Sequence, residues 1–376
     1  MNTKEISAME CNRDYLHPGI SVVLLAYQEA ENLKVLIPKI QEQLDLINQL
    51  NKELYEVIVV DTAQPMDETP EICRQLGCRY VNQEEPHFGG AFRTGIKYAT
   101  YDKFLILDSD GSHNPQYIGD IYQKFISSAA DVVIGSRYVK GGYTNDAKVS
   151  IIMSHILNTA FRFCLGIQVK DISTDYRMYH TADLKAVFLE NKNYDVLQEV
   201  LVKISLNKPN RKLNIIEVPI TFEKRMFGIS KRKLIPFIVD YIKSLSKLTM
   251  MRFPTLYNLI LYVGFGFLAA CLEFFIFSLL VFSKVTSSPE IANVIGAGCG
   301  FLFTFSANTF LNFKKKDKLA RRFGSYAAIC VLGMCFSTGC MHLLKGYVNV
   351  YLLKICLLGT VSLIQFVLNK AITYCD

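Results

Sequence analysis

The stretch Leu105-Ile106-Leu107-Asp108-Ser109-Asp110-Gly111-Ser112 joins an apolar run to two carboxylates that stand one residue apart. We predict from it a buried strand whose carboxyl end delivers Asp108 and Asp110 to the edge of a sheet. In open α/β sheets, ligands lie outside the carboxyl ends of the strands. Magnesium-like ions take one or two protein carboxylates together with phosphate oxygens, so this pair suits a divalent cation that holds a diphosphate. The alternative, a solvated turn after a strand, stays open on this stretch alone.

Strands and helices alternate around this stretch. Strands are expected at residues 20–25, 55–60, 79–81, 104–107, 132–134 and 217–222. Amphipathic helical patterns separate several of them, which predicts an α/β fold with a doubly wound, mostly parallel sheet. Acidic residues follow three of the strands, namely Glu29, Asp61 and the Asp108/Asp110 pair. Since the carboxyl ends of parallel strands meet at one edge, these acids predict a nucleotide site there.

Two common phosphate-binding loops are missing from the sequence. No G-x-G-x-x-G follows the first strand and there is no Walker loop, so NAD and ATP are disfavoured as ligands. Bound phosphate would then depend on a metal and on basic side chains. Candidate cations occur in the polar stretch 171–177 and in the basic run 223–233, which contains Arg225, Ser230 and Lys231. Such a run suits a loop that closes on phosphates; a solvated or membrane-facing surface is the alternative.

The two halves of the 376-residue chain differ in composition. Residues up to about 250 mix polar and apolar side chains, whereas long apolar runs follow and give a mean hydropathy of +0.21. Much of the basic excess behind the net charge of +7 lies beside these runs, which favours an anionic membrane surface over nucleic acid as the partner. The 11 cysteines form no C-x-x-C motif, and the first 19 residues have no signal-peptide apolar region. We therefore expect the first half to be cytoplasmic, in a reducing compartment.

Four segments of the second half are long and apolar enough to span a bilayer. They cover residues 257–282, 290–311, 323–345 and 350–372. Basic residues precede the first segment and fill the 312–322 loop, so the positive-inside rule places this loop and both chain ends in the cytoplasm. Residues 305–313 and 366–374 resemble each other, which indicates two duplicated hairpins related by an axis along the membrane normal.

The chain thus divides into three expected parts. They are a cytoplasmic domain at residues 1–230, an amphipathic membrane-surface linker at 231–255 and a transmembrane domain at 256–376. Glu273, Asn308 and Asn369 are polar residues within the expected spans. Such residues usually join helices; a role toward lipid headgroups or in translocation is the alternative.

The soluble half, over about residues 20–235, resembles the family 2 glycosyltransferases of the dolichyl-phosphate mannose synthase type. The matching motifs are V-V-L-L-A-Y-Q-E (22–29), V-V-D (59–61), D-S-D-G-S-H-N-P (108–115), G-S-R-Y-V-K-G-G (135–142), D-I-S-T-D-Y-R (171–177) and R-M-F-G-I-S-K (225–231). Leu25 stands where the family usually has Pro, Thr62 where a second Asp is usual, and Asp175 where a small residue is usual. The resemblance implies a GT-A fold. The second half resembles the four-helix GtrA-type membrane module, although the Arg-Trp usual after its Asn is missing.

The resemblance also implies roles for individual residues. Those implied for the nucleotide sugar are Leu25, Tyr27, Glu29, Asp61, Asp108, Ser109 and Asp110. Those implied for a Mg²⁺ or Mn²⁺ ion are Asp108, Asp110 and Ser112. Those implied for the acceptor phosphate are Arg137, Arg177, Arg225, Ser230 and Lys231, and the catalytic set is Asp110, Arg137, Arg225 and Lys231.

The reaction that the resemblance implies is inverting, metal-dependent transfer of a hexose from a nucleotide sugar to a polyprenyl or dolichyl phosphate at the cytoplasmic leaflet. Mannose from GDP-mannose is favoured, and UDP-glucose or another UDP-sugar is the alternative donor. The acceptor phosphate is already anionic near neutral pH, so no strong general base is needed. Gln198-Glu199 lies where hydroxyl-directed relatives often carry a base; here it is expected at a helix surface or as a wall of the acceptor site.

Two other functions are weighed against this one. In the first, the membrane module is the functional part, a lipid-sugar flippase or scaffold, and the soluble domain is degenerate. The intact D-x-D pair argues against degeneracy, whereas Leu25 and Thr62 favour it weakly. The second is a processive polysaccharide synthase, which usually needs a Q-x-x-R-W segment; this chain has no Trp.

Overall fold

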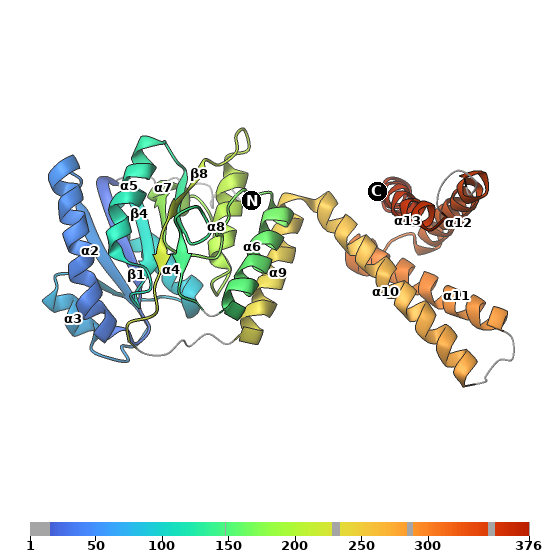
Figure 1. Cartoon of the computed structure of the whole chain (residues 1–376), viewed down its shortest axis with the longest axis horizontal. Helices are drawn as coiled ribbons and strands as arrows, with labels where there is room; N and C mark the ends of the chain where they lie inside the picture. Colours follow the sequence, from blue (N-terminus) through green and yellow to red (C-terminus); the bar gives the residue numbers. More distant parts are fainter. Residues whose placement is uncertain (1–15, 147, 228–233, 284–288, 345–349, 376) are drawn as a thin grey trace. The chain divides into compact units, whose positions relative to one another are not determined.

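The computed structural model describes residues 16–146, 148–227, 234–283, 289–344 and 350–375. The chain divides into two compact units, Met1–Arg252 and Phe253–Asp376 (Figure 1). The boundary differs from the expected three-part division, because the helix within residues 231–255 belongs to the first unit. Two side chains of that helix, Tyr241 and Leu248, are buried in the core of this unit.

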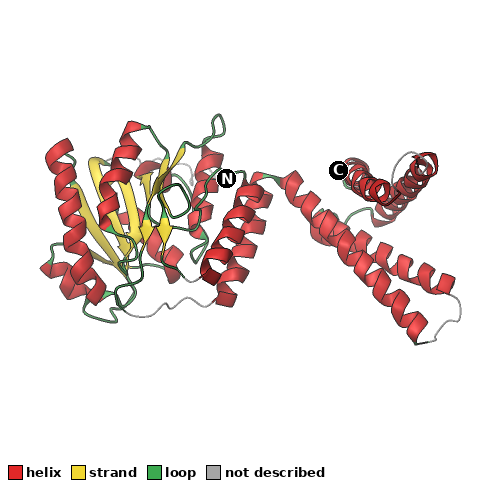
Figure 2. Ribbon diagram, in the orientation of Figure 1, coloured by secondary structure: helices red, strands yellow, loops and turns green. Residues whose placement is uncertain are grey.

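The first unit is built on a seven-stranded sheet (Figure 2). Its strands are β1 (His17–Leu25), β2 (Tyr55–Asp61), β3 (Arg79–Asn82), β4 (Tyr101–Asp108), β5 (Val132–Ser136), β7 (Arg177–His180) and β8 (Ile215–Pro219). They stand in the order β3-β2-β1-β4-β7-β5-β8, and of these described strands only β7 runs antiparallel to its neighbours. A short separate ladder pairs β6 (Tyr143–Thr144) with β9 (Thr221–Phe222). The prediction of a doubly wound, mostly parallel sheet is confirmed.

Helices cover both faces of the sheet (Figure 2). One face carries α2 (Ala30–Asn51), α3 (Thr69–Gln75) and α5 (Ile118–Ser127), which share one apolar core with the strands. The other face carries α4 (His87–Tyr98), α6 (Lys148–Leu165), α7 (Thr181–Lys185), α8 (Val196–Asn207) and α9 (Leu234–Arg252), which share a second core. A 3₁₀ turn, Pro115–Tyr117, precedes α5. This two-sided cover explains why the central strands read as continuous apolar runs.

The register of the central strands brings the predicted acids to one edge. Val22, Val23 and Leu24 of β1 are completely buried, as expected for a strand with helices on both faces. At the end of β1, Leu25 is paired with Val60 on β2 and with Asp108 on β4. The carboxyl ends of these strands therefore lie side by side, and the loops that follow them share one edge.

The elements of this unit that were not predicted include β7 and α6. Strand β7 follows the polar stretch 171–177 and inserts antiparallel between β4 and β5. Helix α6 fills the preceding connection. Strand β7 has only four residues, too few for an alternation of apolar and polar side chains to be recognised. Helix α6 has apolar residues on two faces, so its sequence lacks the amphipathic pattern by which a helix is predicted.

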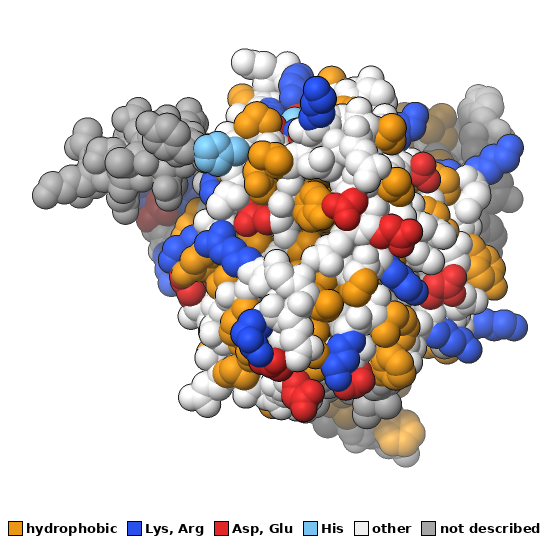
Figure 3. All heavy atoms as spheres, turned by 90° about the vertical axis from the view of Figure 1, so that its left-hand side faces the viewer, with side chains coloured by type: hydrophobic (Ala, Val, Ile, Leu, Met, Phe, Trp, Pro, Cys, Tyr) orange, Lys and Arg blue, Asp and Glu red, His pale blue; other side chains and the backbone are white. Residues whose placement is uncertain are grey.

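The outer surface of the first unit that contains α2 is chemically mixed. The face shown in Figure 3 has acidic and basic side chains interspersed with hydrophobic ones. Several of the charges pair within one helix, as Lys34 does with Glu31 at 2.9 Å and Arg74 with Glu71 at 2.7 Å. Such exposed pairs contribute little to stability, about 0–1 kcal/mol each.

The second unit is helical. It contains α10 (Pro254–Phe282), α11 (Pro289–Ala307), α12 (Leu319–Leu344) and α13 (Val350–Leu368), with π-helical turns at Asn308–Asn312 and Asn369–Thr373. Among the described residues, three helical segments are long and apolar enough to cross a membrane. They are Pro254–Phe282, Val294–Asn312 and Leu319–Ser337. The fourth predicted span coincides with α13 and stays a prediction.

The internal repeat seen in the sequence has a structural counterpart. The turns Asn308–Asn312 and Asn369–Thr373 have the same length and follow the second helix of each hairpin. Each ends in a backbone hydrogen bond to its first residue, donated by Phe313 at 2.8 Å and by Tyr374 at 2.9 Å. The rings of Phe313 and Tyr374 stack with centroids 4.2 Å apart. Asn369 is buried and donates to the Tyr262 hydroxyl at 3.1 Å, so it joins helices as expected.

Candidate active site

The loop after β4 gathers oxygen atoms at the sheet edge. Asp108 ends the strand, and Gly111 takes a positive φ of 80° that turns the chain back. The Ser112 hydroxyl lies 2.6 Å from Asp110 Oδ1 and 3.2 Å from Asp108 Oδ2, and the Ser112 N–H donates to Asp110 Oδ1 at 2.9 Å. The structure therefore brings together the three residues that the resemblance implies for a metal.

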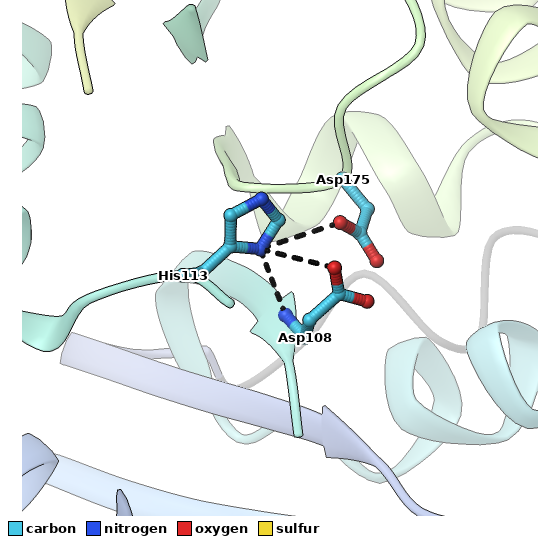
Figure 4. Close-up of side chains that lie close together, drawn as sticks. All are labelled: Asp108, His113 and Asp175. Carbon is cyan, nitrogen blue, oxygen red and sulfur yellow. Dashed lines mark hydrogen bonds and ion pairs between the residues drawn. The ribbon is translucent and has the colours of Figure 1, made fainter. Parts of the chain in front are cut away.

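Two further side chains, His113 and Asp175, lie against Asp108 (Figure 4). His113 Nδ1 is 3.5 Å from Asp108 Oδ2 and 3.5 Å from Asp175 Oδ1. It accepts the Asp108 N–H at 3.1 Å, and its Nε2 lies 3.3 Å from the Thr174 hydroxyl. Because Nδ1 accepts a backbone hydrogen bond, the proton of the neutral ring is on Nε2. Burial lowers the pKa of His113, so the ring stays neutral.

Asp175 is a buried carboxyl group beside another carboxylate. Burial and then the Asp108 charge raise the pKa of Asp175 well above its usual range. Ligand atoms of Asp108, His113 and Asp175 lie within 4.8 Å of one another, which makes this a possible metal site. A divalent cation would neutralise the facing carboxylates, and carboxylate and hydroxyl oxygens are the ligands that Mg²⁺ and Mn²⁺ prefer. To bind a metal, His113 Nδ1 would have to lose the hydrogen bond from the Asp108 N–H. The carboxylate and hydroxyl oxygens therefore fit a metal better than His113 does.

Arg225 links the loop after β9 to the D-x-D loop. Its guanidinium contacts Glu29 Oε1 at 2.9 Å and Asp110 Oδ2 at 3.0 Å. The backbone of the same loop is held as well, because the Met226 N–H donates to the Asp110 carbonyl at 3.1 Å and the Phe227 N–H donates to Asn32 Oδ1 at 3.0 Å. Glu29, expected at the nucleotide sugar, is 6% exposed and is occupied by this ion pair.

The other residues implied for the nucleotide lie at the same edge. Ser109 Oγ donates to the Leu25 carbonyl at 2.7 Å, which ties the β4 loop to the end of β1. Tyr27 is 48% exposed there. Asp61 is buried and accepts the Thr62 N–H at 2.7 Å and the Tyr80 hydroxyl at 3.1 Å. Burial raises the pKa of Asp61.

Arg137 lies in a buried ion pair. Its guanidinium donates to both carboxylate oxygens of Asp171, at 2.7 and 2.8 Å, and to the Ser173 hydroxyl at 2.8 Å. It also donates to Asp146 at 3.3 Å. The structure thus gives Arg137 acidic partners within the protein, and its role toward an acceptor phosphate stays a prediction.

The placement of Arg177 corrects one prediction. Its side chain is completely buried, and it donates to the carbonyls of Ile172, Thr174 and Leu197 at 2.6 to 2.9 Å. Arg177 also donates to the Tyr179 hydroxyl at 3.1 Å. Such an arginine shapes the loop before β7 and presents no donor to an acceptor phosphate at the sheet edge.

Gln198 and Glu199 also differ from expectation. Both are completely buried, so neither lies on a helix surface. Gln198 donates to the Ile172 carbonyl at 2.7 Å. The Glu199 carboxylate accepts the N–H groups of Glu190 and Asn191 at 2.9 to 3.1 Å and pairs with Lys203 at 2.7 Å. These contacts hold a loop and leave Glu199 unsuited to act as a base or an acceptor-site wall.

The remaining predicted residues, Ser230 and Lys231, lie outside the residues that the structure describes. Conversely, sequence reasoning gave His113 and Asp175 no role, although the structure places both against Asp108. The sequence feature that could have indicated a role for Asp175 is an acidic residue within the polar stretch 171–177, directly before a strand.

Two protein families match separate parts of the chain. The family described as Glycosyl transferase family 2 matches residues 21–188, and the family described as GtrA/DPMS, transmembrane domain, matches residues 261–374. The first match includes the D-x-D loop and Asp175, and the second includes both π-helical turns. The mostly parallel sheet of the first unit is a GT-A-like fold, as the resemblance implied.

Relatives with curated names match somewhat more than half of the chain. A dolichol-phosphate mannosyltransferase from Pyrococcus furiosus is 30% identical over 227 residues, which are 57% of this chain and 59% of that protein. A polyprenol monophosphomannose synthase from Mycolicibacterium smegmatis is 27% identical over 224 residues, which are 56% of this chain and 79% of that protein. A crystal structure of glucosyl-3-phosphoglycerate synthase from Mycobacterium tuberculosis with Mn²⁺, uridine-diphosphate and glucosyl-3-phosphoglycerate has 19% identity and a TM-score of 0.47, over 67% of this chain and 84% of that chain.

The family matches agree with the two units found in the structure. The sequence of the D-x-D loop and the parallel topology around it belong to the first match, and the paired hairpins belong to the second. The first unit is therefore similar to the family 2 glycosyltransferases over residues 21–188, and the second unit is similar to the GtrA/DPMS transmembrane domain over residues 261–374.

Proposed function

We propose that this protein is an inverting, metal-dependent glycosyltransferase that moves a hexose from a nucleotide sugar to a polyprenyl or dolichyl phosphate. The observation that carries the proposal is the convergence of Asp108, Asp110 and Ser112 oxygens at the sheet edge, with Arg225 beside them. The names of two curated relatives support a polyprenyl phosphate acceptor and mannose as the sugar. GDP-mannose is the favoured donor, and a UDP-sugar is the alternative.

The residues of the edge have separate tasks in this proposal. Asp108, Asp110 and Ser112 would hold Mg²⁺ or Mn²⁺, which when bound neutralises charge on the leaving diphosphate. The Ser112 hydroxyl contacts both carboxylates and fixes their spacing, and His113 Nδ1 accepts the backbone N–H of Asp108 and so holds the end of the strand. Arg225 orients Asp110 and supplies positive charge where phosphates meet.

The acceptor side needs alignment more than proton removal. A phosphate monoester is anionic near neutral pH, so its oxygen is already a nucleophile. Glu199 stands where hydroxyl-directed relatives often carry a base. Here its carboxylate already accepts backbone N–H groups and pairs with Lys203, which agrees with an acceptor that needs no base. Arg225, with Arg137, Ser230 and Lys231, remains our candidate set for holding the acceptor phosphate in line with the sugar.

The membrane unit fits an acceptor with a long isoprenoid tail. Its basic 312–322 loop favours a cytoplasmic orientation of the first unit, where nucleotide sugars are available. A flippase or scaffold with a degenerate soluble domain is the competing function. In the D-x-D loop, Ser112 contacts both carboxylates and Arg225 pairs with Asp110, which favours an intact enzyme.

A donor panel tests the proposal. The purified protein is incubated with GDP-mannose, UDP-glucose and other nucleotide sugars, with Mg²⁺ or Mn²⁺ and polyprenyl phosphate in mixed micelles. We expect one donor to yield a negatively charged glycolipid that is released by mild acid. A protein that consumes none of the donors, while it still moves a preformed lipid-linked sugar across liposomes, would replace this function by that of a flippase.

A further inference from the structure

A pocket lies in the second unit where α12 begins and the final π-helical turn ends. Two short segments line it: Lys318, Arg321, Arg322 and Ser325 at the start of α12, and Ile372, Thr373 and Cys375 at the end of the π-helical turn. Three of these lining residues are basic and none is acidic. A hollow lined by charges of one sign concentrates ions of the opposite sign, so this pocket suits an anion.

Arg322 builds the pocket, but its charge already has a partner. It is 4% exposed, and its guanidinium donates to the Asp317 carbonyl at 2.9 Å and to Asp317 Oδ2 at 2.8 Å. The same guanidinium donates to the carbonyls of Thr373 and Cys375, so it joins the two segments that line the pocket. Asp317, the only acidic residue in the stretch 314–322, is thus engaged by Arg322.

Lys318 and Arg321 are the cations of the pocket that lack such a partner. Both side chains are exposed, and neither forms a hydrogen bond or an ion pair within the part of the chain that the structure describes. They stand at the N-terminal end of a 26-residue helix whose first turn has no acidic residue. The helix dipole is positive at this end, so basic side chains are repelled there. An anion between them would relieve this repulsion and would also meet the N–H groups of the first turn, which have no partner inside a helix.

The place of the pocket along the chain indicates which anion reaches it. The basic residues lie between two candidate membrane spans, Val294–Asn312 and Leu319–Ser337, and at the start of the second. The ends of membrane spans lie at the level of the lipid headgroups. Ile372, which also lines the pocket, is 53% exposed and gives it an apolar wall. A phosphate joined to apolar chains fits such a hollow better than a free phosphate ion does, and Arg321 and Lys318 carry the donors that phosphate oxygens accept from.

We propose that this pocket binds the phosphate group of an anionic membrane lipid, with Arg321 and Lys318 as its main contacts. Arg322 holds the walls of the pocket together and leaves the other two cations for the ligand. The proposal concerns the second unit alone and rests on the chain being a membrane protein. It does not depend on which reaction the first unit catalyses.

Tryptophan fluorescence tests the site, because the chain has no Trp of its own. The reporter is full-length Ile372→Trp in phosphatidylcholine nanodiscs that hold a minor fraction of one lipid brominated near the headgroup end of its acyl chain. Bromine quenches only a nearby indole, so the quenching measures how often that lipid occupies the pocket. We expect brominated phosphatidylglycerol to quench more strongly than the same fraction of brominated phosphatidylcholine, as for an enrichment of about fivefold for each unpaired cation.

A matched pair of double variants separates a pocket from a general positive surface. In the reporter background, Lys318→Gln/Arg321→Gln should make the two brominated lipids quench about equally. Lys314→Gln/Lys316→Gln removes the same charge from the same loop, but from positions that do not line the pocket, and should keep most of the difference. All four side chains are exposed, so folding is not expected to depend on them.

Three results would overturn the proposal. One is equal quenching by the two brominated lipids in the reporter itself. Another is an equal loss of the difference in both double variants, which would leave only the long-range attraction of a basic loop. The third is removal of the difference by inorganic phosphate at constant ionic strength, which would assign the pocket to a water-soluble phosphate. None of these readouts uses sugar transfer, so a failure here is distinguishable from a failure of the proposed function.

Discussion

The guanidinium of Arg225 lies 3.0 Å from Asp110 Oδ2 and, through its other nitrogen, 2.9 Å from Glu29 Oε1. Arg225 belongs to a third loop and thus joins two loops that follow strands, and the two acids that it contacts, Glu29 and Asp110, are 81 residues apart in the sequence. A planar guanidinium can serve two carboxylates at once, whereas a lysine ammonium is a single point charge. The D-x-D loop and the loop that follows β9 are therefore fixed relative to each other by Arg225.

The first prediction is that Arg225→Lys lowers turnover by about 10- to 100-fold, as expected for the loss of one charge-assisted hydrogen bond. Lysine keeps the charge but cannot bridge Glu29 and Asp110 together. Steady-state kinetics with saturating donor and acceptor measure the effect. Lys224→Ala, at the exposed neighbouring position, is the matched control and should keep nearly full activity. Equal losses in both variants would reduce Arg225 to part of a general basic surface.

The second prediction concerns the metal. Asp108→Asn and Asp110→Asn should each lower turnover by at least about 10²-fold, the scale of losing a principal transition-state contact. Both should also weaken Mn²⁺ binding measured by electron paramagnetic resonance, which does not depend on turnover. Asp120→Asn, an exposed acid on α5, is the control. Full activity in EDTA would remove the metal-dependent mechanism.

The third prediction uses a buried acid far from this edge. Asp131 accepts Lys208 at 2.8 Å and the Asn214 N–H at 2.8 Å, and it pairs with Arg211. Burial by itself raises the pKa of Asp131. The hydrogen bonds from Arg211 and Lys208 outweigh this effect and hold the pKa of Asp131 well below its usual range. A carboxylate with a lowered pKa stabilises the fold above its unfolded pKa of about 4, and that stability is lost as the pH falls further.

Asp131→Asn should therefore reduce the free energy of unfolding by about 2 kcal/mol at neutral pH, and the difference from the unmodified protein should shrink below about pH 4. Thermal unfolding of the full chain in detergent across this pH range measures it. Asp183→Asn removes an acid that shares Lys208 but is more exposed, and it should cost less. A difference that stays constant down to pH 2 would contradict the ionic explanation.

The fourth prediction concerns topology. A reporter inserted after Lys316 and one at the C-terminus should both lie in the cytoplasm, and one near Ser287 should lie outside, because basic residues are concentrated in the 312–322 loop and before α10. Cysteine accessibility or a fused phosphatase reports the side. A C-terminus found outside would mean an odd number of spans and would contradict the two-hairpin arrangement.

Much of the fold followed from simple patterns. The run that ends in Asp108 and Asp110 predicted a central strand, and the structure buries that strand on both faces and places the two acids at the sheet edge. The pattern worked because a strand covered by helices on both sides must be apolar throughout, and because parallel strands end at a common edge. Residues 305–313 and 366–374 likewise predicted a repeat that reappears as two π-helical turns.

The site was less predictable, for a physical reason. A sequence motif can identify an arginine but does not determine the direction in which its side chain points. Arg177 stands at the start of β7, and its orientation depends on that strand inserting antiparallel between β4 and β5, which brings backbone carbonyls around the guanidinium. The same insertion carries Asp175 to Asp108. Both outcomes are set by tertiary pairing, which short-range patterns do not contain.

The measurement that tests the central claim most directly is the identity of the nucleotide released for each lipid product. The protein is given donor and polyprenyl phosphate labelled with ³²P in the lipid phosphate, and nucleotides and lipids are separated after a single time course. Transfer of the sugar alone predicts one nucleoside diphosphate per glycolipid, with the labelled phosphate retained between lipid and sugar. Release of a nucleoside monophosphate, or a glycolipid that carries a second phosphate, would show phosphosugar transfer and contradict the account.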